Sequence, residues 1–179
     1  MRALALALVL AACGSATPSV VTQTSTHRGP NGEILGPTSR SEIEHELPAW
    51  RDVIVSTSFD RDAAEHLASV APGADVDVFL GTWCGDSRRE VSRLFRALEV
   101  AERGAALPFT IRFIGVDRAK TAPGFTEGAD LHYVPTIIVR RDGAEVGRIV
   151  ESTPPSTSVE RALLDLLEGR ARGVISGRR

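Results

Sequence analysis

Thr82-Trp83-Cys84-Gly85-Asp86-Ser87 is the stretch that decides the fold, because it joins a strand-like segment to an amphipathic helix. The preceding residues, Val76 to Leu80, are mostly apolar or β-branched, which is typical of a strand buried on both faces. Downstream, apolar residues recur every three or four positions as far as Ala101, and this spacing predicts a helix. Cys84 is therefore expected at the N-terminus of that helix.

The expected position of Cys84 has a chemical meaning. Free N–H groups and the helix dipole favour an anion at a helix N-terminus, and a cysteine thiolate is such an anion. The thiolate is also the form of cysteine that attacks disulfides. The alternative is that Cys84 is a buried residue that serves as a small apolar side chain.

Two motifs carry a family resemblance. The segment Trp83-Cys84-Gly85-Asp86-Ser87 resembles the Trp-Cys-Gly-x-Cys active site of the thioredoxin family, with Ser87 replacing the second cysteine. Downstream, Val134-Pro135-Thr136 resembles the loop that places a cis-proline opposite the active-site cysteine in that family. The resemblance implies a three-layer α/β fold, with a central mixed β-sheet flanked by helices.

The same resemblance assigns roles to individual residues. It implies that Cys84 is the nucleophile. The hydroxyl of Ser87 can donate a hydrogen bond that stabilises the Cys84 thiolate, or it can serve as a helix cap, and both roles can hold at once. The resemblance also implies that Trp83, Val134 and Pro135 shape a groove for an extended substrate segment. The buried aspartate that assists proton transfer in many thioredoxins is replaced by Val78, and Asp77 is expected on the opposite face of the sheet.

Further elements are expected on either side of the motif. The pattern predicts a strand at 53–55, a helix at 61–70 capped by Asp60, and a strand at 109–116 followed by a polar loop at 118–133. Two antiparallel strands are expected around the Asp142-Gly143 turn. The last helix is expected to begin at the capping-box pattern Thr157-Ser158-Val159-Glu160.

The first residues resemble a bacterial lipoprotein signal. Residues 1–12 combine Arg2 with an apolar run that is too short for an ordinary transmembrane helix. The end of this run, Leu10-Ala11-Ala12-Cys13, resembles a lipobox, which implies that Cys13 is lipidated. We expect an exported protein anchored to the cell envelope, at the periplasmic face of the outer membrane because Gly14 follows the cysteine. An ordinary secretory signal cleaved nearby is the alternative.

The composition predicts the domain boundaries. Residues 13–41 are rich in Ser, Thr, Pro and Gly and are interpreted as the lipidated cysteine with a disordered tether. Residues 42–169 are long enough for one thioredoxin-like domain, and 170–179 form a basic tail. A formal net charge of −2 gives no indication of nucleic-acid binding.

The number of cysteines limits the chemistry. The chain has two, so lipidation of Cys13 leaves Cys84 as a single thiol without a resolving partner. Any redox cycle then needs an external thiol reductant or a partner protein. The expected partners are envelope proteins that carry thiols or disulfides, and no metal or cofactor is expected.

Three functions are compatible with these features. The first is monothiol thiol-disulfide exchange by a membrane-anchored, thioredoxin-like protein. The second is a binding module that keeps the groove and performs no chemistry, so whether the protein is an enzyme stays open. The third is a glutaredoxin-like monothiol protein, because Cys84-Gly85-Asp86-Ser87 resembles the Cys-Gly-Phe-Ser site of that group.

Overall fold

The computed structural model describes residues 27–178, and within this range the chain forms a seven-stranded mixed sheet. Its strand order is β1-β2-β4-β3-β5-β6-β7. The strands are β1 (His27–Arg28), β2 (Ile34–Thr38), β3 (Ala74–Leu80), β4 (Thr110–Gly115), β5 (Thr136–Arg141), β6 (Ala144–Val150) and β7 (Gly173–Ser176). Strand β3 pairs parallel with β4 and antiparallel with β5, so it is the central strand of the sheet. The Cys84 motif follows directly after the end of this strand.

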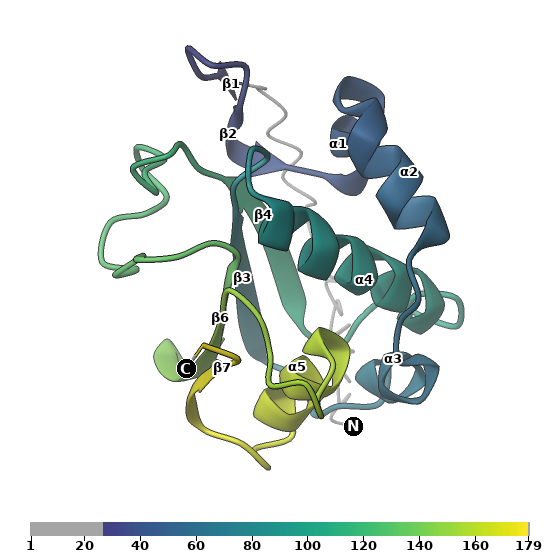
Figure 1. Ribbon diagram of the computed structural model, residues 1–179. Helices are drawn as coiled ribbons and strands as arrows, with labels where there is room; N and C mark the ends of the chain where they lie inside the picture. The colour runs from purple at the N-terminus through teal and green to yellow at the C-terminus, as the bar shows by residue number, and fades with distance from the viewer. Residues whose placement is uncertain (1–26, 179) are drawn as a thin grey trace, which may run out of the picture.

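The helices gather on one face of this sheet, as Figure 1 shows. They are α1 (Arg40–Glu46), α2 (Pro48–Ser56), α3 (Arg61–Leu67), α4 (Gly85–Ala101) and α5 (Val159–Leu167). On the other face, the loop at 117–133 covers the end of the sheet that carries Cys84 (Figure 1). The predicted fold class, a central mixed sheet flanked by helices, is confirmed, with a loop as its third layer.

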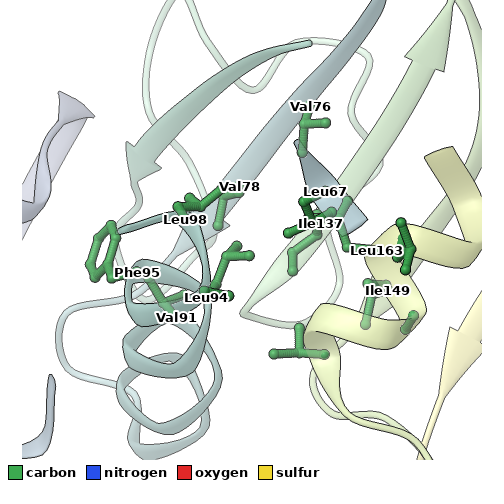
Figure 2. Close-up of a cluster of buried hydrophobic side chains, with 14 of the residues drawn as sticks. Leu67, Val76, Val78, Val91, Leu94, Phe95, Leu98, Ile137, Ile149 and Leu163 are labelled. Atoms are coloured by element: carbon green, nitrogen blue, oxygen red, sulfur yellow. The ribbon is translucent and has the colours of Figure 1, made fainter. Parts of the chain in front are cut away.

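The main hydrophobic core lies between the helices and the sheet. Figure 2 shows this core, with Leu94 of α4 and Leu163 of α5 on the helix side and Val78 of β3 on the sheet side. A second, smaller cluster lies on the opposite face, under the 117–133 loop. Its buried members are Phe79, Ile114, Val116, Ala122, Ala129, Val134 and Ile138, and Trp83, Cys84 and Leu131 pack against them.

Several local predictions are confirmed. Asp60 caps α3 by accepting a hydrogen bond from the N–H of Ala63. Asp142 and Gly143 both have positive φ, as the tight turn between β5 and β6 requires. The last helix begins one residue later than the capping-box pattern indicated, because Ser158 is the cap.

The predicted strand at 53–55 is wrong, because these residues lie in α2. Pro48 occupies the first turn of the helix, where its missing N–H costs nothing. Trp50 and Ile54, four residues apart, are the buried side chains of this helix. The β-branched run at 53–55 therefore gave a wrong prediction, because the helical packing of Trp50 and Ile54 overrides strand propensity.

The structure also differs from the predicted tether at 13–41. Strand β2 pairs antiparallel with β4, and Ile34 is fully buried. Gly115 permits the close approach of the two strands, because a Cβ there would lie 2.2 Å from the carbonyl oxygen of Ile34. Residues 34–41 thus belong to the folded domain despite their polar and glycine-containing composition. The signal peptide, Cys13 and the first part of the tether lie outside the described residues.

The predicted basic tail at 170–179 differs as well. Residues Gly173–Ser176 form β7, which adds to the sheet edge in parallel with β6. The pairing is close at Gly147, where a Cβ would lie 2.5 Å from the carbonyl oxygen of Gly173. The folded domain therefore continues past residue 169.

Candidate active site

Cys84 lies where β3 ends and α4 begins, as the sequence predicted. Its extended backbone makes it the N-cap residue, with Gly85 the first residue of the helix. The N–H of Cys84 donates to the carbonyl oxygen of Gly81, and its own carbonyl accepts from the N–H of Arg88. These two bonds fix the turn, and the side chain is only partly buried, so the thiol is accessible from the surface.

The thiol of Cys84 faces the loop that contains Pro135. The Val134–Pro135 peptide bond is cis, and the sulfur lies 3.3 Å from the carbonyl oxygen of Val134. The structure thus brings together two motifs that are 50 residues apart in the sequence. A carbonyl oxygen can accept a hydrogen bond only from the protonated S–H group. A thiolate would instead be stabilised by the N–H groups of the α4 N-terminus.

Ser87 lies one turn into α4 and is fully buried. Its Oγ accepts a hydrogen bond of 3.1 Å from the N–H of Gly81. Among the described residues, the Ser87 hydroxyl makes this one hydrogen bond, and it makes none with Cys84. Ser87 therefore ties the end of β3 to the helix, and the predicted contact with the Cys84 sulfur is not formed in this state.

Two contacts hold the side chain of Trp83 in place. The indole Nε1 donates to the carbonyl oxygen of Val116 at 3.1 Å. The guanidinium carbon of Arg118 lies 5.0 Å from the ring centroid, within the range of a cation–π contact. Gly81 gives the ring its space, since a Cβ there would lie 2.7 Å from it.

Thr82 anchors the motif and was not identified from the sequence. Its carbonyl oxygen accepts from the indole Nε1 of Trp50 at 3.1 Å, and its Oγ1 accepts from the N–H of Ile34 at 3.2 Å. Trp50 and Ile34 come from α2 and β2, the two segments that the sequence assigned incorrectly. No local pattern around them indicates these contacts, which depend on the tertiary fold.

The cis-proline loop presents backbone groups beside Cys84. Among residues 27–178, the N–H of Val134 has no hydrogen-bond partner, whereas the carbonyl oxygen of Pro135 accepts from Glu151 at 2.7 Å. An unpaired N–H next to a reactive sulfur can pair with an extended peptide, as in strand addition. Val134 and Pro135 are both buried, so this loop is a fixed part of the site.

Asp77 does not take part in the Cys84 site. As predicted, it lies on the face of the sheet opposite to Val78 and the α4 helix. Its carboxylate is almost completely buried and forms ion pairs with Arg112 at 2.7 Å and Arg140 at 2.5 Å. These arginines neutralise Asp77 and hold it in a structural network of the sheet.

The described residues also bear on metal binding and on membrane spanning. Within residues 27–178, no cluster of three or more His, Cys, Asp or Glu side chains is arranged to hold a metal ion. In the same range, no helix is both long and apolar enough to span a bilayer.

Comparisons with known proteins bear on the fold. No protein-family model and no curated protein matches the chain. A solved protein of unknown function from Pseudomonas aeruginosa aligns with 16% identity and a TM-score of 0.54, covering 76% of this chain and 94% of that one. An HIV epitope-scaffold gives 18% identity, the same TM-score and the same coverage. These likenesses show the fold alone.

Thioredoxin-like folds are also among the structural neighbours, at low identity and partial coverage. A thioredoxin-like protein from Edwardsiella tarda shows 24% identity and a TM-score of 0.35, covering 62% of this chain and 98% of that one. The fold is of the mixed α/β class, and its candidate site is a cysteine at a helix N-terminus that faces a cis-proline loop.

Proposed function

We propose that this protein is a membrane-anchored thiol-disulfide exchange protein that acts through a single cysteine, Cys84, on thiols or disulfides of envelope proteins. One observation carries the proposal: the accessible sulfur of Cys84 lies 3.3 Å from the Val134 carbonyl in the cis-proline loop, beside the unpaired N–H of Val134. A nucleophile and a peptide-binding edge are thus adjacent. The lipid anchor at Cys13 and the periplasmic location rest on the sequence resemblance.

The exchange would proceed in three balanced steps. The Cys84 thiolate attacks one sulfur of a partner disulfide, a new S–S bond forms to Cys84, and the second partner sulfur leaves as a thiolate that takes up a proton from water. An external thiolate then attacks the partner sulfur of this mixed disulfide. Cys84 leaves as a thiolate, and the external thiol is now joined to the partner by a disulfide. A second external thiolate attacks the external sulfur of that bond, and the partner sulfur leaves as a thiolate that takes up a proton. The two external thiols are oxidised to a disulfide, and their two electrons have passed to the partner. The external thiol is required because Ser87 cannot resolve the intermediate.

The direct test uses the full-length chain with Cys13→Ser, purified in nonionic detergent, so that Cys84 is the sole thiol. A disulfide-bonded peptide is added and the adduct is detected by intact mass, with Cys13→Ser/Cys84→Ser as the control. We expect a mixed disulfide that an added small thiol releases. Absence of an adduct in the native protein, with labelling after denaturation, would contradict the proposal.

The anchor requires its own test. In cells, the unmodified chain is expected in the membrane fraction with a lipid-sized mass increase at Cys13. The Cys13→Ser variant should lack that increase. An unmodified Cys13 in the exported protein would leave the ordinary secretory signal as the explanation.

A binding module without chemistry is the second candidate. Two contacts favour it: the S–H of Cys84 faces the carbonyl oxygen of Val134, and the Ser87 hydroxyl is engaged by Gly81. Under this alternative, partner binding measured by co-purification would survive Cys84→Ser. Under thiol exchange, the covalent complex would disappear in that variant.

A further inference from the structure

Two arginines near Cys84, Arg118 and Arg88, have no carboxylate partner among residues 27–178. Arg118 is exposed and stacks on Trp83, the residue next to Cys84. Lys120 lies in the same turn, where its N–H donates to the carbonyl oxygen of Asp117. Arg88 follows Cys84 by one helical turn and donates its N–H to the Cys84 carbonyl. In the part of the chain that the structure describes, Arg118 and Arg88 form no ion pair with a carboxylate, whereas the charge of Lys120 acts on Asp117 and helps to lower its pKa.

The carboxylates in the segments that flank Cys84 are, in contrast, already engaged within the chain. The pairs are Asp86 with Arg89 at 2.7 Å, Asp117 with Thr121 at 2.8 Å, and Asp130 with His132 at 3.1 Å. Burial acts to raise the pKa of Asp117, but the two hydrogen bonds from Thr121 outweigh it and hold the pKa below its usual range. Asp117 is therefore ionised and turned toward its own loop.

Elsewhere among residues 27–178, the arginines without an ion pair are Arg51, Arg141 and Arg172, and the first two donate to backbone carbonyls instead. Most other arginines of the described chain form ion pairs, as Arg161 does with Asp60 and Arg148 with Glu145. The chain as a whole has a formal net charge of −2. The protein is acidic, yet cations without carboxylate partners lie beside a thiol that we propose to be reactive. These cations create a local positive field that attracts anionic partners.

We propose that the Cys84 site selects protein partners whose disulfide or thiol is flanked by acidic side chains, and that Arg118 is the main specificity-determining residue. This inference rests on the proposed function. The guanidinium of Arg118 is stacked on Trp83, the residue that precedes Cys84, and its charge would complement a partner carboxylate. Arg88 adds to the same field.

The test compares three small disulfides of similar size that differ in charge: 3,3′-dithiodipropionate, 2-hydroxyethyl disulfide and cystamine. The protein is the full-length Cys13→Ser chain, and the rate of mixed-disulfide formation is followed by intact mass. N-acetylcysteinamide, run with the same reagents, corrects for their intrinsic reactivity. We expect the corrected rate for the anionic reagent to exceed that for the cationic one by about tenfold, the lower end for electrostatic steering.

Variants assign the effect to Arg118. Arg118→Glu should abolish or reverse the preference, and Arg118→Lys, which keeps the charge, should restore most of it. Arg172→Glu is the matched control, because Arg172 is exposed at the start of β7, at the opposite end of the sheet from Cys84, and changes the net charge equally. The preference should also weaken toward about 1 M salt, where the Debye length is about 3 Å.

The outcomes separate the two proposals. If Cys84 reacts with none of the reagents, thiol exchange itself fails. If it reacts with all three at equal corrected rates, or if the preference persists in Arg118→Glu, thiol exchange stands and the selection of acidic partners is overturned.

Discussion

The thiol of Cys84 donates a hydrogen bond to the carbonyl oxygen of Val134 across 3.3 Å. This contact joins the N-terminus of α4 to the cis-proline loop. A serine hydroxyl can make the same contact as a donor, so Cys84→Ser should leave the free energy of unfolding within about 0.5 kcal/mol of the parent chain. Urea unfolding followed by circular dichroism checks this, and a large loss would disqualify the variant as a control for trapping experiments.

Ser87→Cys is expected to create an intramolecular disulfide with Cys84. The two residues are three apart at the start of α4, a spacing that brings Cβ atoms to about 5–6 Å, close enough for the small backbone adjustment of a disulfide. Intact mass in the Cys13→Ser background should show a loss of 2 hydrogens, roughly 2 Da, and no free thiol after oxidation. Two persistently titratable thiols would show that the first turn of α4 cannot close such a bond.

Trp50→Phe should destabilise the fold through the Cys84 motif. The indole of Trp50 donates to the Thr82 carbonyl, and phenylalanine leaves that acceptor without its partner. We expect a loss of about 1–3 kcal/mol in the free energy of unfolding, together with altered reactivity of Cys84. Trp83→Phe serves as the comparison, since the bond from Trp83 to Val116 lies on the other side of the motif. A neutral result for Trp50→Phe would contradict an anchoring role.

Ile34→Ala tests whether the segment before residue 42 belongs to the domain. Ile34 is fully buried in the main core, so its truncation should cost about 2–5 kcal/mol. Leu35→Ala is a matched control, since Leu35 is only partly buried. Denaturant unfolding decides the point. Equal, small losses in both variants would favour a dispensable tether. For the same reason, a soluble form that begins at residue 42 is expected to fold poorly.

Asp60 should make stability depend on pH. Burial acts to raise the pKa of Asp60, but the hydrogen bond from Ala63 and the contacts with Arg161 and Ser158 outweigh it, so the pKa is lowered. A lowered pKa in the folded state gives stability that is present above the unfolded value and lost as the pH falls through the folded one. Asp60→Asn keeps the helix cap without the charge, at a cost of about 0.5–1 kcal/mol at pH 7.

The difference between the parent chain and Asp60→Asn should begin to shrink below about pH 4, and it should be lost once the pH has passed the lowered pKa of the folded state, where both side chains are neutral. Thermal unfolding between pH 7 and pH 3 measures this difference. A difference that stays constant over that range would show that the charge of Asp60 has no role.

Much of the site could be predicted from local signals. A buried strand followed by a helical repeat placed Cys84 at the N-terminus of α4, and the Val134-Pro135 pair indicated the facing loop. Both signals depend on residue type and spacing over short distances. Asp142 and Gly143 likewise specify their turn, because few residue pairs tolerate two positive φ angles.

The remainder depends on contacts between segments far apart in the chain. Composition suggested that the residues around Ile34 could not fold, yet β4 offers an open edge that pairs with them. Val53, Ile54 and Val55 have strand propensity, but Trp50 and Ile54 bury one helical face against α4. The Thr82 anchor combines both segments, and no single-sequence pattern encodes it.

Cys84 packs against the smaller of the two hydrophobic clusters, the one covered by the 117–133 loop rather than by a helix. Opening of that loop would expose this cluster while the core beneath α4 and α5 stays intact. Local and global unfolding are thus separable in this protein. Amide hydrogens around Val116 and Val134 should exchange with solvent faster than those of β5, and the exposure of the Cys84 side chain would vary with the population of the open state.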